Sequence, residues 1–362
     1  MICTDNRIVM TLDAGGTNFV FSAIQNGKEI IPPLKLSANP DSLESCLETI
    51  KHGFIHIKNS VPEQPVAISF AFPGPADYPA GIIGDLPNFP SFRGGVALGP
   101  YLEELFKIPV FINNDGNLFA YGEALTGVLP EINDRLKLAG SIKRYTNLLG
   151  ITLGTGFGCG VVINGRILSG DNAAGGDIWC FRNKKYPSFI VEESVSIRAV
   201  KRVYREFSGE ETGWSPQEIF EIAEGNRPGD RNAAIKSFEE LGEMAGDAIA
   251  AAITIVDGLI VIGGGLSGAS KYIVPALVRE LNSATGMMTG ERFSRLQMNV
   301  FNLDDQAQFD EFIRSRATKV KIPGTNRTTD YDPMKRIGVI TSKRGTSHSI
   351  AMGAYLYALN RL

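Results

Sequence analysis

The chain contains two copies of one short pattern: an apolar run, a glycine-rich turn, a second apolar run and an Asn-Gly pair. The first copy spans 8–34 and the second spans 148–168. Short apolar runs of this kind fit buried strands, and Asn-Gly is a strong signal for a two-residue hairpin. The repeat predicts a duplicated α/β fold with two similar lobes facing across a cleft. Chance likeness between two glycine-rich hairpins is the alternative.

The turn of the first copy combines glycines with one carboxylate. Asp13 ends the first run, and Gly15, Gly16 and Thr17 follow. Glycines let the backbone approach a bulky anion, and exposed N–H groups with a hydroxyl can cradle phosphate oxygens. Because a carboxylate would repel phosphates, Asp13 implies Mg²⁺ between them, held partly through water. The alternative interpretation is a glycine-rich hairpin with no ligand.

The turn of the second copy lacks the carboxylate. Leu153 corresponds to Leu12, and Gly154 stands where Asp13 would be. Each turn joins strand to strand, whereas a P-loop or a dinucleotide-binding turn joins strand to helix. We therefore expect one phosphate loop from each lobe and a carboxylate only in the first.

A second candidate carboxylate follows the run 110–112. Asp115 lies at the end of that predicted strand, just before a predicted helix over 118–125. Open α/β sheets bind ligands at this edge, where Asp115 can accept a proton from a substrate hydroxyl that attacks a phosphoryl group. An N-cap is the structural interpretation of the same residue. In the stiff loop 86–90, Asn88 offers an amide to a hydroxyl, or simply occupies a turn.

A third glycine-rich stretch, 263–268, matches G-x-G-x-x-G after the predicted strand 259–262. A dinucleotide site would need an acidic residue at the end of a strand about 20 residues later. Residues 282–290 contain neither Asp nor Glu. We therefore favour a flat glycine surface for an adenosine group, and keep a dinucleotide-dependent oxidoreductase as the alternative.

Composition indicates a soluble globular chain. Of 362 residues, 43% are hydrophobic and 21% are charged, as in ordinary globular domains. The net charge of −3 gives no general attraction to nucleic acid or to an anionic membrane. The four scattered cysteines form no CxxC pair, which argues against a zinc or disulfide framework. We find neither a signal peptide nor a membrane-spanning run, so we expect a cytoplasmic protein.

The length favours two domains. We place an N-terminal lobe, with the first phosphate loop and Asp115, at 1–127. A C-terminal lobe, with the second phosphate loop and the adenosine surface, follows at 128–362, and the last helix may pack back on the first lobe. Predicted helices include 42–59, 101–106, 192–207, one capped by a Ser215–Glu218 capping box, one capped by Asp230, and 349–359, whereas 304–335 is predicted to be a solvated insertion.

Together these motifs resemble the ROK family of sugar kinases, which share the duplicated actin-like ATPase (ribonuclease H-like) fold. The resemblance covers nearly the whole chain, and its motifs are specific in their order. They are Asp13 to Thr17, Phe72 to Pro75, Pro87-Asn88, Asn114 to Asn117, Gly122-Glu123, Gly154 to Gly156 and Gly263 to Gly265.

The resemblance implies transfer of the γ-phosphoryl group of ATP to a hexose or hexose derivative, typically at the 6-hydroxyl. It implies Asp115 as the general base and Asp13 as the residue that meets Mg²⁺. It also implies a homodimer. The implied sugar-binding residues are Gly74, Asn88, Asn114, Asp115, Asp177 and Glu192, and the implied ATP-binding residues are Asp13, Gly15, Gly16, Thr17, Asn18, Thr155, Gly156, Gly264 and Gly265.

The sequence departs from the family pattern at 175–180. The family has Gly-Glu-x-Gly-His there, whereas Asp177 stands here in place of the Glu, and Trp179 or Cys180 in place of the His. The structural zinc of the family needs that His and a cysteine cluster, so we predict no zinc. Trp179 either stacks on a sugar face or packs in the core, and we favour the core.

Two other functions share the same resemblance. A sugar-responsive regulator of this family would carry a helix-turn-helix before the first glycine turn, and only seven residues precede Ile8. A sugar-binding protein without catalysis would not need Asp13 and Asp115 together. We therefore expect a kinase that acts on a sugar and ATP, with no nucleic-acid or membrane partner.

Overall fold

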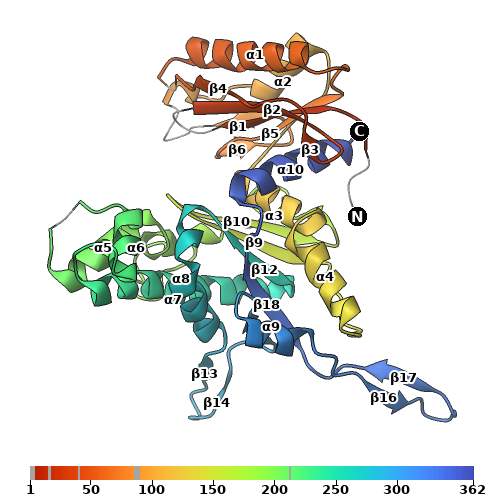
Figure 1. The fold of residues 1–362 in the computed structure, drawn as a ribbon, viewed down its shortest axis with the longest axis vertical. Helices are drawn as coiled ribbons and strands as arrows, with labels where there is room; N and C mark the ends of the chain where they lie inside the picture. Colours follow the sequence, from red (N-terminus) through yellow and green to blue (C-terminus); the bar gives the residue numbers. More distant parts are fainter. Residues whose placement is uncertain (1–4, 15–17, 40, 85–89, 212) are drawn as a thin grey trace. The chain divides into compact units, whose positions relative to one another are not determined.

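The computed structural model describes residues 5–14, 18–39, 41–84, 90–211 and 213–362 (Figure 1). The chain forms two compact units. The first contains Met1–Gly127, Gly160–Gly176 and Arg344–Leu362, and the second contains Val128–Cys159 and Asp177–Lys343. One division lies at residue 127, where we predicted the lobe boundary. Gly160–Gly176 and the C-terminal segment group with the first unit.

The first unit is built on a sheet in the order β3-β2-β1-β5-β8, with β4 paired to β2. β1 pairs antiparallel with β2 and parallel with β5, and β5 pairs parallel with β8. The carboxyl ends of β1, β5 and β8 therefore meet at one edge. The strands are β1 (Val9–Ala14), β2 (Asn18–Gln25), β3 (Lys28–Glu29), β4 (Leu34–Ser37), β5 (Ala67–Ala71) and β8 (Val110–Asn113).

Strand alternation sends the two faces of this sheet to different partners. Met10 and Leu12 point into an aromatic core with helices α1 and α2, whereas Thr11 and Asp13 line a cavity beside α10. Figure 1 shows α1 and α2 on one face and α10 on the other. The remaining elements are α1 (Leu43–Ser60), β6 (Ala76–Asp77), β7 (Ile82–Ile83), η1 (Pro90–Phe92), α2 (Leu98–Phe106), α3 (Asp115–Leu125), β11 (Arg166–Ile167) and α10 (Thr346–Leu359).

Helices α3 and α10 pack at a glycine contact. A Cβ on Gly122 would overlap the Ser349 carbonyl, and one on Gly353 would overlap the Leu118 carbonyl. Beside this contact the Ser349 hydroxyl donates to the buried Glu123 carboxylate at 2.6 Å. Gly122 and Glu123, which belong to the family motifs, therefore bring the C-terminal helix against α3.

The second sheet repeats the strand order of the first, as β11-β10-β9-β12-β18-β15. β9, β12, β18 and β15 run parallel. Both hairpins turn at an Asn-Gly pair with positive φ, 52° and 69° at Asn26-Gly27 and 49° and 72° at Asn164-Gly165. The predicted repeat is confirmed. The strands are β9 (Leu148–Leu153), β10 (Phe157–Ile163), β12 (Leu259–Gly263), β15 (Asn299–Asn302) and β18 (Arg336–Thr341).

Helices of the second unit start largely where the sequence places their caps. Ser215 and Glu218 form the capping box of α6, and Asp230 accepts a hydrogen bond from the Ala233 backbone at the start of α7. The helix predicted from 192 is different: η3 covers Val191–Ser194, and α5 begins only at Ile197. The helical elements are α4 (Val128–Leu138), which we did not predict, η2 (Ile178–Cys180), η3, α5 (Ile197–Ser208), α6 (Pro216–Glu224), α7 (Arg231–Val256), η4 (Gly265–Ala269), α8 (Ser270–Leu281) and α9 (Gln306–Ile313).

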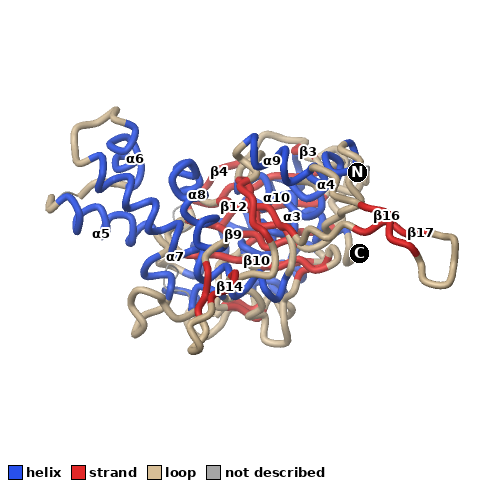
Figure 2. The backbone as a smooth tube through the Cα atoms, turned by 90° about the horizontal axis from the view of Figure 1, so that it is seen from below, coloured by secondary structure: helices blue, strands red, loops and turns tan. Residues whose placement is uncertain are grey.

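Two hairpins extend from the second unit (Figure 1), and Figure 2 shows the one over 318–331 from a second direction. One pairs β13 (Ala284–Gly286) with β14 (Arg292–Ser294), and the other pairs β16 (Thr318–Lys321) with β17 (Thr328–Tyr331). The second hairpin lies within the predicted insertion 304–335 and is exposed, whereas α9 in the same stretch buries Phe312. Within the part of the chain that the structure describes, no helix has the length and apolar character needed to cross a membrane.

Candidate active site

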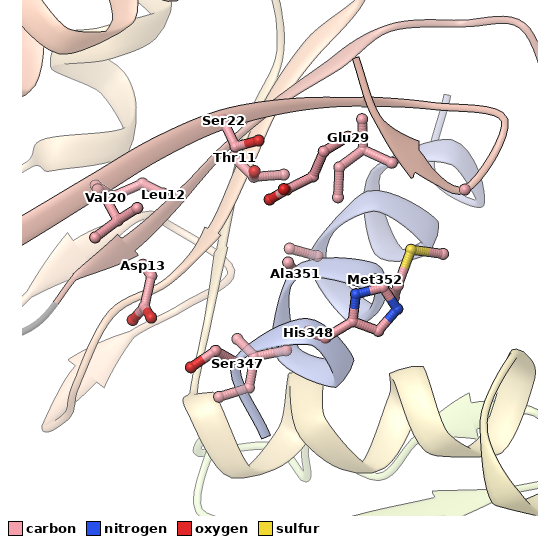
Figure 3. Close-up of a pocket in the computed structure, with 14 residues that line it drawn as sticks. Thr11, Leu12, Asp13, Val20, Ser22, Glu29, Ser347, His348, Ala351 and Met352 are labelled. Carbon is pink, nitrogen blue, oxygen red and sulfur yellow. The ribbon is translucent and has the colours of Figure 1, made fainter. Parts of the chain in front are cut away.

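Asp13 lies at the end of β1, beside the start of α10. Its side chain is exposed and accepts a hydrogen bond from the Ser347 hydroxyl. Desolvation by neighbouring atoms raises the pKa of the Asp13 carboxyl, and the bond from Ser347 opposes that rise. Figure 3 shows Ser347, at the first turn of α10, close to Asp13, and both residues line a cavity of about 230 Å³. Ser347 is a site residue that we did not predict.

Asp115 is the first residue of α3, directly after β8. It is not the N-cap, as the structural interpretation proposed. Asn114 caps the helix instead, because its side chain accepts the Gly116 N–H at 2.8 Å. The Asp115 carboxylate accepts the same N–H at 2.9 Å, and stays accessible to solvent.

Asp13 and Asp115 stand at the same edge of the first sheet. Asp13 is in register with Ala71 of β5, and Ala71 with Asn113 of β8, so the two strands are separated by about 10 Å. Desolvation raises the pKa of the Asp115 carboxyl, the Gly116 N–H lowers it, and the Asp13 carboxylate raises it further. Within this unit, the negative charge of Asp13 therefore contributes to the raised pKa of Asp115.

The residues predicted to hold a sugar in this unit meet at Tyr78. The Tyr78 hydroxyl donates to the Phe72 carbonyl at 3.0 Å, and the Asn114 amide donates to the Tyr78 oxygen at 3.4 Å. A Cβ on Gly74 would lie 3.0 Å from that oxygen. Gly74 and Asn114 are thus brought together by a buried phenol that we did not predict. Asn88 lies outside the described residues.

The first phosphate loop is described only at its two ends. Asp13 and Asn18 frame it, the latter as the first residue of β2. Gly15, Gly16 and Thr17 lie outside the described residues, so their predicted contacts with phosphate stay predictions.

The second phosphate loop is a closed turn in which the exposed Thr155 stands between two glycines. The Gly154 N–H donates to the Gly156 carbonyl at 3.1 Å, and the Gly154 carbonyl accepts the Ile197 N–H at 2.9 Å. A Cβ on Gly156 would lie 2.6 Å from the Glu192 carboxylate, which accepts the Phe157 N–H at 3.0 Å. A larger residue at 156 would therefore have to displace the Glu192 carboxylate that supports the loop. Thr155 is the turn's one hydroxyl.

The third glycine stretch packs tightly against β9. Gly264 has a φ of 88°, and a Cβ there would overlap the Leu153 backbone, whereas Gly265 faces open space. The exposed side of Gly265 is therefore flat, as the predicted adenosine surface requires. About 20 residues after the turn the chain enters the β13–β14 hairpin, which lacks the acidic strand end of a dinucleotide site.

Asp177 and Glu192 both belong to the second unit. Desolvation raises the pKa of the Asp177 carboxyl, and a hydrogen bond from the Trp179 side chain lowers it. Trp179 is 40% exposed, so our preference for a core position was wrong. The Cys180 thiol donates to the Asp177 carbonyl at 2.9 Å. Glu192 also contacts Arg198 at 3.3 Å.

The described residues include no group of three or more His, Cys, Asp or Glu side chains that could hold a metal ion. Magnesium needs less from the protein, because one or two carboxylates with substrate phosphates and water complete its shell. Asp13, exposed and near a second carboxylate, fits that requirement.

The sequence model of a protein family described as "ROK family" matches residues 9–291. The crystal structure of a glucokinase from Parabacteroides distasonis is 69% identical, covers 100% of both chains and superimposes with a TM-score of 0.93. The N-acetyl-D-glucosamine kinase of Vibrio cholerae is 27% identical over 273 residues, which cover 70% of this chain and 83% of that protein.

A solved structure with lower sequence identity shares the fold. It is a glucokinase from Streptomyces griseus, solved with glucose and AMPPNP, which is 17% identical with a TM-score of 0.60 and covers 96% of this chain and 98% of its own.

Proposed function

Because the chain belongs to the ROK family and is a sugar kinase, we propose that it transfers the γ-phosphoryl group of ATP to the 6-hydroxyl of a hexose or hexose derivative. The fold is the duplicated actin-like ATPase fold. The observation that carries the proposal is the pair of carboxylates, Asp13 and Asp115, at one sheet edge.

Asp115 is the general base of the proposed reaction. The attacking hydroxyl must lose its proton as its oxygen bonds to phosphorus, and an exposed carboxylate at the sheet edge can accept it. The raised pKa of Asp115 makes it a better proton acceptor than an ordinary aspartate. The Asn114 side chain, which caps the start of α3, orients the sugar beside Asp115.

Asp13 would hold Mg²⁺, in part through water. When bound, the ion neutralises the charge of the β- and γ-phosphates. The chain's own contribution is one carboxylate, with the Ser347 hydroxyl beside it. Gly15, Gly16, Thr17 and Asn18 bind phosphate in this proposal.

In the second unit, Thr155 and Gly156 bind phosphate, and Gly264 and Gly265 carry the adenosine. Thr155 and Gly265 are exposed, and none of the four positions carries a charged side chain. Little covalent chemistry is needed from the protein, so positioning supplies most of the rate. Asp177 and Glu192 contact the sugar in this proposal. The chain also forms a homodimer, and analytical ultracentrifugation would test that state.

Replacing Asp115 tests the role of the base. We expect Asp115→Asn to lower kcat by about 10²- to 10⁴-fold, because the amide accepts no proton, while the sugar still raises the melting temperature. A coupled assay for ADP over hexoses, amino sugars and N-acyl hexosamines measures the loss. The control is Asp134→Asn on the exposed face of α4. Unchanged turnover in Asp115→Asn would remove Asp115 from this role.

A further inference from the structure

The segment from Asp177 to Ser194 connects two predicted sugar contacts, Asp177 and Glu192. It contains two short 3-10 helices, η2 and η3, which both pack on α7. Between them the chain folds back on itself: the Val191 N–H donates to the Phe181 carbonyl at 2.7 Å. A segment with so little regular structure needs another source of rigidity.

Asn183 supplies that rigidity from the centre of the segment. Its side chain is fully buried, at 0% exposure. The amide nitrogen donates to the Ile190 carbonyl at 3.2 Å and to the Ser194 hydroxyl at 2.8 Å. The amide oxygen accepts the Lys185 and Tyr186 N–H groups, each at 3.0 Å. All four hydrogen bonds open to an asparagine amide are therefore made.

Two lysines next to Asn183 attach the segment to the helices beneath it. Lys184 pairs with Glu243 of α7 at 3.1 Å and with Glu280 of α8 at 3.0 Å. Lys185 pairs with the buried Glu240 of α7 at 2.7 Å. The segment is thus held internally by an amide and externally by ion pairs.

The donors in this segment do not fit the zinc that the family resemblance implies. Cys180 is its one cysteine, and the segment has no histidine. His52 and His56 lie on α1, and His348 on α10, all within the first unit. Structural zinc sites need four nitrogen or sulfur ligands in a tetrahedron, which these residues do not supply.

We propose that Asn183 is a positioning residue, and that its buried amide holds the Asp177–Ser194 segment without a metal. Through Ser194 the amide fixes η3, whose Glu192 supports the second phosphate loop. Through its bond to the Ile190 carbonyl, next to the pair formed by Val191 and Phe181, the amide also fixes η2, which directly follows Asp177. The part of the proposal that concerns sugar affinity rests on the proposed kinase function.

Metal content is the first test. We expect the full chain, purified without chelators, to contain far less than one zinc per chain by elemental analysis. A zinc-selective chelator should leave its melting temperature unchanged. Zinc at one equivalent per chain, with a melting temperature lowered by the chelator, would overturn the proposal.

Hydrogen exchange tests the amide directly and does not depend on catalysis. In Asn183→Ala, the Lys185 and Tyr186 N–H groups lose their acceptor, so we expect their protection to fall while that of β12 stays unchanged. Ser194→Ala removes a single bond and serves if Asn183→Ala does not fold. Asn232→Ala, at an exposed position of α7, is the matched control. Unchanged protection in both segment variants would refute the role of Asn183.

Steady-state kinetics tests the consequence for the site. Because displacing a contact by about 1 Å can cost up to roughly a hundredfold, we expect KM for the sugar to rise by about tenfold in Asn183→Ala. The same variant should keep a kcat much closer to that of the wild type. A fall in kcat with no change in KM would contradict a positioning role. If the wild type phosphorylates no sugar, the proposed function fails, while the exchange result still decides on Asn183.

Discussion

The glycine turn after β1 and the glycine turn after β9 have the same place in two sheets of the same strand order, yet they differ in chemistry. The first begins with Asp13, whose carboxylate is held by Ser347. The second begins with Gly154, whose carbonyl holds the start of α5 through Ile197. Duplication supplies two glycine turns, and in the proposed function a difference at one position assigns the cation to the first of them.

Sterics do not explain why the second turn lacks a carboxylate. A Cβ on Gly154 would meet nothing within 4 Å, and its φ is not in the left-handed region. An aspartate would therefore fit there. In the proposed function, charge disfavours it, because a second carboxylate beside the phosphates would have no cation of its own.

Removing the carboxylate from the first turn should have the largest effect. We expect Asp13→Asn to lower kcat/KM for MgATP by about 10²- to 10³-fold, since the group that orients the cation is lost. When the rate is measured against Mg²⁺ concentration, the concentration that gives half-maximal rate should be higher than for the wild type. A wild-type Mg²⁺ dependence in this variant would mean that the Asp13 carboxylate does not distinguish the first turn from the second.

Adding a carboxylate to the second turn should have a smaller effect of the same kind. We expect Gly154→Asp to fold and to raise KM for ATP by about tenfold, because a charge close to a phosphate costs on the order of 1–4 kcal/mol. Gly154→Ala is the control and should behave as the wild type. Equal effects from Ala and Asp would show that shape, not charge, matters at 154.

Ser347 lies beside Asp13 in the first unit, so its loss should affect the first turn. We expect Ser347→Ala to raise the Mg²⁺ concentration for half-maximal rate by about two- to fivefold, the range of one partly exposed hydrogen bond. KM for the sugar should not change. A rise in the sugar KM with no change in Mg²⁺ dependence would point to a general loss of packing around α10.

The pH dependence should show the coupling between Asp13 and Asp115. The pKa of Asp115 is raised, so kcat/KM should fall on acidification at a pH above the usual range for aspartate. Because the Asp13 charge contributes to that rise, the acidic limb should move to lower pH in Asp13→Asn. An unmoved limb would mean that the two acids do not interact.

Local patterns in the chain were enough to predict a large part of this architecture. The period of apolar residues and the two Asn-Gly turns predicted the repeated sheet, and the capping residues Ser215 and Asp230 located helix starts. The position of Asp115 after β8 also followed from order along the chain. Such features depend on neighbours within a few residues, so the sequence expresses them directly.

The contacts that hold the site together join residues that are distant in sequence. Ser347 contacts Asp13, and Tyr78 contacts Asn114. The exposure of Trp179, which we expected in the core, also depends on the folded structure. The small residues at 353 and 354 predicted close packing of the last helix, but only the structure identified α3 as its partner.

What the chain determined by itself was therefore its repeat, its turns and the identity of its carboxylates. Which hydroxyl orients Asp13, which amide rigidifies the segment after Asp177 and which carboxylate supports the second phosphate loop were decided by tertiary packing. The physical reason is that hydrogen bonds between distant residues depend on strand register and helix placement. Those are properties of the whole folded unit, and no short window of sequence contains them.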